Sequence, residues 1–238
     1  RALEDICARL EQLAQATDGV DQEIRKSARE LNDQWRSQRG GTDPALRAIE
    51  SRFKKAQTAV EAMLSARSRA REAAVWTTLA AKETLCEELD NLARSGGGAD
   101  DATQLQSVQD RWAALPPLPD NWEKKLAARR AAALGALSDP EATGDHLARI
   151  ERGIEPRRER LLELELSLGL DSPAELQQQR LALQVKQLRE RFKNAAPAEA
   201  ETAAERLVAW CAEPGVADAA DRQRCERIFA KLSVKPHG

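Results

Sequence analysis

The chain has 238 residues, which is enough for one large domain or two modest ones. Charged residues make up 32% of it and aromatic residues only 3%, with no tyrosine. Alanine, leucine, glutamate, arginine and glutamine dominate, and because these are strong helix formers the composition predicts an almost wholly α-helical protein. The formal net charge of −2 excludes a global electrostatic attraction to nucleic acid or to a membrane.

The four cysteines are Cys7, Cys86, Cys211 and Cys225, and they show neither a Cys-x-x-Cys motif nor metal-ligand spacing. In a chain of this length they indicate reduced thiols of a cytoplasmic protein instead of a disulfide framework. No stretch of about 18 consecutive apolar residues is present. We therefore expect a cytoplasmic protein without a transmembrane helix.

Apolar residues recur at helical spacing from the start of the chain. This periodicity predicts a first helix over residues 2–16 and a second over residues 20–37. Gly40 and Gly41 follow the second helix, and glycine is the residue that most often ends a helix. The first part of the chain therefore begins with a helical hairpin.

A much longer helix is predicted to follow. Asp43 is a suitable N-cap and Pro44 suits the first helical position. No further glycine or proline occurs until after Arg94, so the sequence predicts one helix of about 50 residues over 44–94. Its first half has heptad-like apolar spacing, typical of coiled-coil packing. Residues 65–71 lack a large apolar side chain, and we expect them to be exposed between two packed ends.

A glycine-rich segment, 95–101, is the expected linker between an N-terminal lobe, 1–94, and a C-terminal lobe, 102–238. Within the C-terminal lobe, Gly153 and Pro156 are expected to separate two helices. The helices predicted there cover residues 102–114, 121–137, 141–152, 157–168, 173–194, 198–212 and 218–232.

The segment Ser-Pro-Ala-Glu over residues 172–175 has the pattern of a capping box with proline at the first helical position. It predicts that Ser172 caps a helix beginning at Pro173, with Glu175 completing the box. The large apolar residues of this helix are spaced by four, three and four positions: Leu181, Val185, Leu188 and Phe192.

A unit of helix, tryptophan, turn and Ala/Arg-rich helix occurs three times. Its tryptophans are Trp35, Trp112 and Trp210, and the first and third units add Phe53 and Phe229. The spacing is irregular, but the recurrence is typical of a helical-repeat protein. The shared position indicates that each tryptophan packs in the corner between two helices.

For Trp35 the alternative is a platform on which a nucleic-acid base stacks, with Arg36 and Arg39 beside it. The second unit has only Arg111 next to its tryptophan and the third has no adjacent arginine. This difference favours packing over binding.

The repeated units resemble bacterial proteins built from repeats of domain of unknown function 349. The most specific part is LLELELSLGLDSPAELQQQRLALQVKQLRERF, residues 161–192, because those proteins carry a similar Glu-Leu-x-x-Gly-x-x-Ser-Pro segment before a Gln/Leu/Arg-rich helix. The resemblance covers most of residues 20–232. It implies a helical, cytoplasmic, bacterial protein, and it supplies no catalytic residues.

Residues with catalytic chemistry are scarce. Nucleophilic or acid–base catalysis would need a histidine near a serine or cysteine, and the chain has only His146 and His237. Asp145 and Glu141 lie near His146, and we interpret this cluster as a solvated helix start. No metal-binding Glu-x-x-His pair and no phosphate-binding glycine loop occurs. We therefore expect no enzyme activity and no cofactor.

Charge is unevenly distributed along the chain. Twelve basic residues and five acidic residues lie between Ile24 and Arg71. This excess can mark a surface for nucleic acid or an acidic partner, and the alternative is a solvated pair of helices. Because aromatic residues are sparse, nucleic acid would be held through its phosphates. The candidate contact residues are Arg36, Arg39, Arg52, Lys55, Arg67 and Arg71.

The sequence thus predicts an all-α fold of long antiparallel helical hairpins in two lobes. The leading functional hypothesis is a non-enzymatic scaffold or adaptor that binds another protein. The alternative is an RNA-binding protein that uses the basic early helices.

Overall fold

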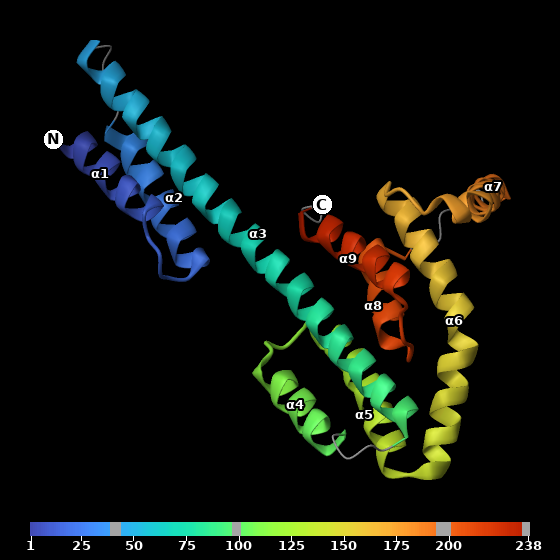
Figure 1. Cartoon of the computed structure of the whole chain (residues 1–238). Helices are drawn as coiled ribbons and strands as arrows, with labels where there is room; N and C mark the ends of the chain where they lie inside the picture. Colours follow the sequence, from blue (N-terminus) through green and yellow to red (C-terminus); the bar gives the residue numbers. More distant parts are fainter. Residues whose placement is uncertain (39–43, 97–100, 194–200, 235–238) are drawn as a thin grey trace. The chain divides into compact units, whose positions relative to one another are not determined.

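The computed structural model describes residues 1–38, 44–96, 101–193 and 201–234. These residues form nine α-helices and one 3₁₀ turn and no strand, which confirms the predicted all-α fold (Figure 1). The helices are α1 (Ala2–Ala14), α2 (Asp21–Gln38), α3 (Pro44–Ser95), α4 (Asp101–Ala114), α5 (Asp120–Ser138), α6 (Pro140–Leu168), α7 (Gln177–Lys193), α8 (Ala203–Ala212) and α9 (Ala219–Val234), and the 3₁₀ turn η1 is Ala174–Leu176. The Gly40–Gly41 turn, the Asp43 cap and His237 lie outside the described residues.

The predicted long helix is confirmed by α3, which runs without interruption from Pro44 to Ser95. No residue of α3 between Leu64 and Trp76 is buried, as expected for a segment without large apolar side chains. The chain forms two compact units, Arg1–Arg71 and Glu72–Gly238. They divide within α3, whereas the sequence analysis placed the boundary at residues 95–101.

The first unit packs α1 and α2 against the first part of α3. Its core contains Ile6, Leu10, Leu31 and Val60, which recur at helical spacing on the three helices. Trp35 at the end of α2 is only 6% exposed, and its ring stacks on Phe53 of α3 with the centroids 4.0 Å apart. This is the arrangement expected of a residue that packs the corner of a hairpin.

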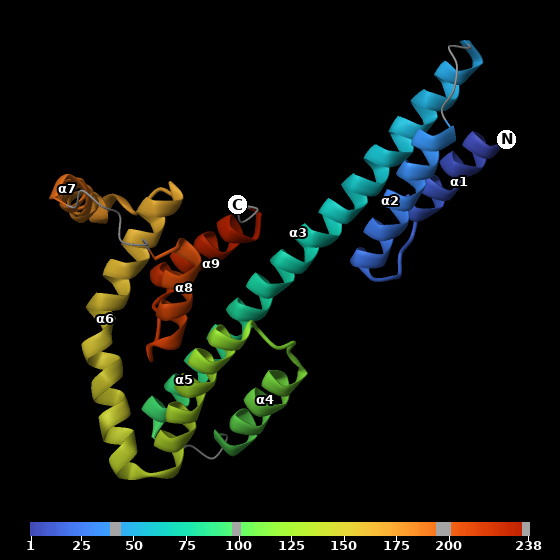
Figure 2. The ribbon, with the colours of Figure 1, turned by 180° about the vertical axis from the view of Figure 1, so that it is seen from behind.

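The second unit packs α4 to α9 with the last part of α3. Helices α5 and α6 lie side by side, and α8 and α9 pack on α6 (Figures 1 and 2). Trp210 of α8 is 1% exposed and lies in the same core cluster as Phe229 of α9. Trp112 of α4 is only partly buried, with Lys82 Nζ 4.9 Å from its ring centroid. The three repeated tryptophans therefore differ in how completely their hairpins enclose them.

The prediction of two helices over 141–152 and 157–168 is wrong, because α6 continues through Pro156. Proline removes one helical hydrogen bond, but tertiary packing outweighs that local preference. Ile150 and Arg157 are buried on either side of the proline, so both halves of the helix are packed within the second unit. Asp139 caps the start of α6, and Gly169 at φ 66° ends it.

The predicted capping box at residues 172–175 is also wrong. Pro173 occupies the N-cap position of η1 and no side chain caps this turn, whose first residues include Glu175. The Ser172 hydroxyl instead accepts a hydrogen bond of 2.6 Å from Arg180 Nη1. Arg180 lies in the next turns of the chain, so the local pattern gave no indication that it would compete for this hydroxyl. A capping box does occur at α8, between Thr202 and Glu205.

Candidate functional site

Two features of the second unit depart from the usual distribution of residues, and the first is a group of buried charges. Five side chains from three helices meet there, and none of these residues is more than 5% exposed. We call this group the polar core: Glu83 and Asp90 of α3, Arg129 of α5, and His146 and Arg157 of α6.

Asp90 lies at the centre of the polar core. One carboxylate oxygen accepts a hydrogen bond from His146 Nε2 at 2.8 Å. The other accepts from Arg129 Nη2 at 2.8 Å and from the backbone amide of Gly215 at 2.9 Å. Burial favours the neutral acid, but the contacts with His146, Arg129 and Gly215 outweigh it and hold the pKa of Asp90 below its usual value. Asp90 is therefore a paired carboxylate inside the fold.

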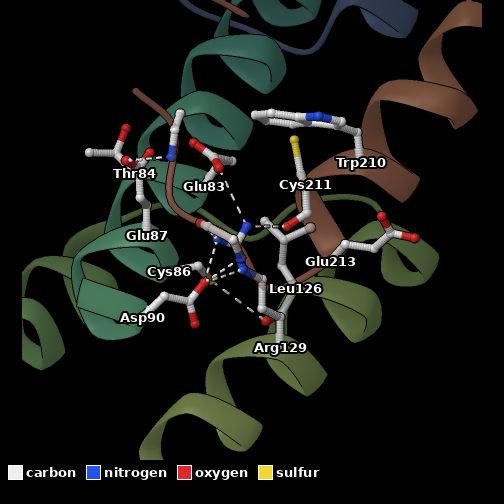
Figure 3. Close-up of polar contacts among 12 residues, drawn as sticks. Glu83, Thr84, Cys86, Glu87, Asp90, Leu126, Arg129, Trp210, Cys211 and Glu213 are labelled. Atoms are coloured by element: carbon white, nitrogen blue, oxygen red, sulfur yellow. Dashed lines mark hydrogen bonds and ion pairs between the residues drawn. The ribbon is translucent and has the colours of Figure 1, made fainter. Parts of the chain in front are cut away.

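The two arginines of the polar core hold the C-terminal end of α8 and its connection to α9, and Figure 3 shows the contacts of Arg129. Arg129 donates to the carbonyl of Cys211 at 2.7 Å and to that of Gly215 at 3.0 Å. Arg157 donates to the carbonyl of Trp210 at 2.8 Å, and its guanidinium lies 3.9 Å from the centroid of that indole. The last carbonyls of a helix have no hydrogen-bond donor within the helix, and these arginines donate to them.

Glu83 is the remaining member of the polar core, and it lies 3.4 Å from both Arg129 and Arg157. Burial raises the pKa of Glu83, and the two guanidinium groups offset only part of that effect. Every charged group of the polar core thus has a partner within the protein. Because these residues are at most 5% exposed and pair with one another, the arrangement is suited to holding helices together.

The interpretation of His146 as part of a solvated helix start is wrong. The residue is 0% exposed, and its ring pairs with Asp90, which lies 56 positions earlier in the chain. The neighbouring polar residues Glu141 and Asp145 are exposed. Their polar side chains suggested that the whole segment is solvated, and nothing in the segment indicated that His146 pairs with Asp90 on α3.

The cysteines of the second unit are also enclosed. Burial raises the pKa of Cys86 to about 12, and burial raises the pKa values of Cys211 and Cys225 well above the usual thiol value. A thiol acts as a nucleophile only when ionised, so these three cysteines are unreactive near neutral pH. No group of three or more potential metal ligands occurs among the residues that the structure describes.

The basic residues singled out by the sequence analysis are largely engaged in ion pairs of the first unit. Arg52 binds both carboxylate oxygens of Glu11 at 2.7 Å. Arg67 and Arg71 both contact Asp21, at 3.2 Å and 2.5 Å. Hydrogen bonding to Arg71 is the main reason that the pKa of Asp21 lies below its usual value. These three arginines tie α3 to the α1–α2 pair, and they do not form a continuous free surface.

The other candidate basic residues are more exposed. Lys55 is exposed, and so is Arg36, whose guanidinium lies 3.9 Å from the Asp33 carboxylate. Arg39 lies outside the described residues. The structure therefore does not bring the five described candidate residues together as one site.

The second unusual feature is a row of exposed apolar side chains on α7. Leu181 is 61% exposed, Val185 40% and Leu188 53%, and we call these three residues the α7 stripe. The side chain of Leu183, in contrast, is buried. Arg180 holds the start of the helix by donating to the carbonyl of Leu170 at 2.7 Å, in addition to its bond with Ser172. The spacing of the stripe was visible in the sequence, but its exposure was not.

The exposure of the α7 stripe follows from the position of its helix. Figures 1 and 2 both show α7 beside the C-terminal end of α6, and among the described residues its extensive contacts are with α6 and η1. In the part of the chain that the structure describes, no helix has the length and apolar character required to span a bilayer. The stripe is an apolar row on a helix whose other exposed residues are mostly polar.

Comparison with known proteins gives a match to one family model, over residues 48–121. No curated protein and no solved structure matches the chain. The matched range, residues 48–121, contains Phe53, Trp112 and most of α3. The segment 161–192, on which the resemblance chiefly depended, lies outside that range. Residues 48–121 match the model of the family described as Domain of Unknown Function (DUF349), the family that the sequence was found to resemble.

Proposed function

We propose that the protein is a cytoplasmic, non-enzymatic adaptor that binds another protein through the α7 stripe. The observation that carries this proposal is the exposure of Leu181, Val185 and Leu188 in one row on one helix. Contiguous exposed apolar side chains typically mark interaction sites, whereas isolated ones are ordinary. Many other leucines of the second unit are buried in its core, so the exposure of the stripe does not result from poor packing of the whole unit.

The distribution of exposed apolar residues supports the same proposal. Six large apolar residues are notably exposed among the described residues, and three of them form the stripe. Transferring such a side chain from water to an apolar contact contributes roughly 1.5–3 kcal/mol when burial is complete. A partner that covered the stripe would therefore gain a useful part of its binding free energy from these residues.

The buried features of the second unit support a role without catalysis. The polar core is almost entirely buried, and burial favours the neutral form of the thiols of Cys86, Cys211 and Cys225. All four cysteines are free and buried, which suits a reducing compartment and supports the cytoplasmic assignment. These groups stabilise the scaffold that presents α7.

RNA is the second candidate partner, and exposed cations in the first unit favour it. Arg25, Lys26 and Arg29 of α2 are exposed, and so is Lys55 of α3. Such residues could contact phosphates, with an affinity that falls steeply as salt increases. The candidate is weaker than the protein partner because Arg52, Arg67 and Arg71 already pair with carboxylates.

An affinity purification of the full chain, with and without nuclease, tests the proposal. Two variants are compared with the wild type: Leu181→Gln/Leu188→Gln in the stripe and Arg25→Glu/Arg29→Glu on α2. We expect one or more identified proteins to be retained after nuclease treatment, lost with the stripe variant and kept with the α2 variant. Retention of RNA that depends on Arg25 and Arg29 and ignores the stripe would overturn the proposal in favour of the second candidate.

A further inference from the structure

We infer that the α7 stripe receives an amphipathic helix of a partner protein, and that one flank of this partner helix is acidic. The inference rests on the proposed function, because it names the class of partner for the same surface. It follows from three properties of α7: which face is free, how far the stripe extends and which charges border it.

The free face of α7 is opposite the face that anchors the helix. Successive residues of an α-helix are about 100° apart, so Leu181, Val185 and Leu188 lie within an arc of roughly 60°. Leu183, which is buried, lies roughly 160° away from Val185. One side of α7 is thus held by α6 and η1, and the stripe on the other side is available to a partner.

The length and spacing of the stripe suit a helical partner. Its first and last members are seven residues apart, which corresponds to about 10 Å along the helix axis. Anchors at positions i, i+4 and i+7 are those by which two helices pack along one another. Strand addition would require an exposed sheet edge, and the described residues contain no strand. Recognition of a proline-rich segment would require a groove lined by aromatic rings, whereas this stripe is aliphatic.

The charges beside the stripe indicate which charge the partner helix carries. Lys186 and Arg189 are exposed and three positions apart, and both lie on the side of the stripe next to Val185. The opposite side carries the exposed neutral residues Gln177 and Gln184. Arg180 also lies on that side, but its guanidinium is held by the Leu170 carbonyl and the Ser172 hydroxyl. Acidic residues on a docked helix would therefore meet cations along one flank and polar amides along the other.

The same charges argue against a second copy of the chain as the occupant. Pairing two α7 helices through their stripes would bring Lys186 and Arg189 of both copies to one interface. The sequence of α7 contains five basic residues and one acidic residue, so such a pair would be dominated by like charges. Complementarity is achieved by an acidic helix from a different protein.

Two designed peptides of three heptads test this inference on the full chain. Both carry leucines at the spacing of the stripe, and they differ only in having glutamate or lysine at the flanking positions. Binding is measured by fluorescence anisotropy for the wild type, Leu181→Gln/Leu188→Gln and Lys186→Glu/Arg189→Glu, with Arg25→Glu/Arg29→Glu as the matched control. Sedimentation of each protein without peptide reports its oligomeric state, and circular dichroism reports its fold.

We expect the glutamate peptide to bind the wild type at least tenfold more tightly than the lysine peptide. The stripe variant should lose this binding, and the flank variant should reverse the preference, while the α2 control keeps it. Equal binding of both peptides would overturn the acidic partner and leave the proposed function intact. A wild-type dimer that becomes monomeric in the stripe variant would identify a second copy as the occupant and overturn the inference. If neither peptide binds a monomeric wild type, the acidic helix is overturned and the proposed function depends on the affinity purification alone.

Discussion

The polar core and the α7 stripe belong to the same compact unit. The polar core places charged residues inside the protein, and the stripe places apolar residues on its surface. Asp90 and His146 of the polar core are 0% exposed, whereas Leu181 of the stripe is 61% exposed. The charged groups inside have partners on α5, α6 and the α8–α9 connection. The side chains of the α7 stripe, in contrast, remain 40–61% exposed. The comparison teaches that partners, and not burial by itself, separate a structural group from a binding surface.

The largest expected effect is on the polar core. Asp90→Asn removes the charge that faces Arg129, and breaking a buried ion pair typically costs about 3–5 kcal/mol. Urea unfolding of the full chain measures this loss. The matched control is Glu88→Gln on the same helix, because Glu88 forms a partly exposed ion pair with Arg111 and such pairs contribute roughly 0–1 kcal/mol. Equal losses for the two variants would show that the polar core does not stabilise the fold.

The pH dependence of stability sharpens the same point. The pKa of Asp90 is lower in the folded protein than its usual value, so the folded state favours the ionised carboxylate. Its contribution is fully present above the unfolded pKa of about 4 and is lost as the pH falls through the lower, folded pKa. We expect the free energy of unfolding of the wild type to fall more steeply below pH 4 than that of Asp90→Asn. Parallel curves for the two proteins would contradict this assignment.

A smaller effect is expected where the polar core meets the α8–α9 connection. A Cβ atom added at Gly215 would lie 2.6 Å from Arg157 Nε, which is too close for a stable contact. Gly215→Ala should therefore cost about 1–3 kcal/mol through overpacking. Gly144→Ala is the control, since its added atom would meet nothing within 4 Å and alanine favours the helix that contains it. If Gly144→Ala lowers the free energy of unfolding as much as Gly215→Ala does, the contact with Arg157 is not the cause.

The contact that anchors α7 should have a still smaller effect on stability. Ser172→Ala removes one of the two acceptors of Arg180 and should cost about 1 kcal/mol. Hydrogen exchange should increase in α7 and remain unchanged in the core of α5 and α6. Uniform acceleration over the whole second unit would show that Ser172 acts on the global fold.

The smallest effect on stability is expected at the α7 stripe. Leu181→Gln/Leu188→Gln changes exposed positions, where substitutions usually alter the free energy of unfolding by about 0.5 kcal/mol or less each. Leu183→Gln on the buried face of the same helix should cost more, because it places an amide against α6. A stripe variant as destabilised as Leu183→Gln would mean that the stripe packs within the protein.

Much of the helix pattern could be predicted from the placement of glycine and proline. The uninterrupted helix over 44–94 followed from the absence of both residues, and α3 confirms it. The same reasoning failed at Pro156, where the packing of Ile150 and Arg157 sustains a helix that the local preference would end. Local signals predict an element well when no distant contact opposes them.

The polar core could not have been predicted, because its members are brought together only by the fold. Asp90 and His146 are 56 residues apart, and Arg129 contacts a connection more than 80 residues later. The ion pairs of Arg52, Arg67 and Arg71 could not be predicted for the same reason, since Glu11 and Asp21 come from other helices. The spacing of Leu181, Val185 and Leu188 was visible in the sequence. Only the structure shows that α6 and η1 leave that face uncovered.

Site-specific photocrosslinking in cells tests the central claim most directly. A benzophenone-bearing residue is placed in the full chain at Val185, in the middle of the stripe, or at the exposed Lys55 of the first unit. We expect a discrete protein adduct from position 185 that survives nuclease and disappears when Leu181 and Leu188 are both changed to glutamine. Position 55 should give no such adduct. A nuclease-sensitive adduct from position 55, with none from position 185, would contradict the account.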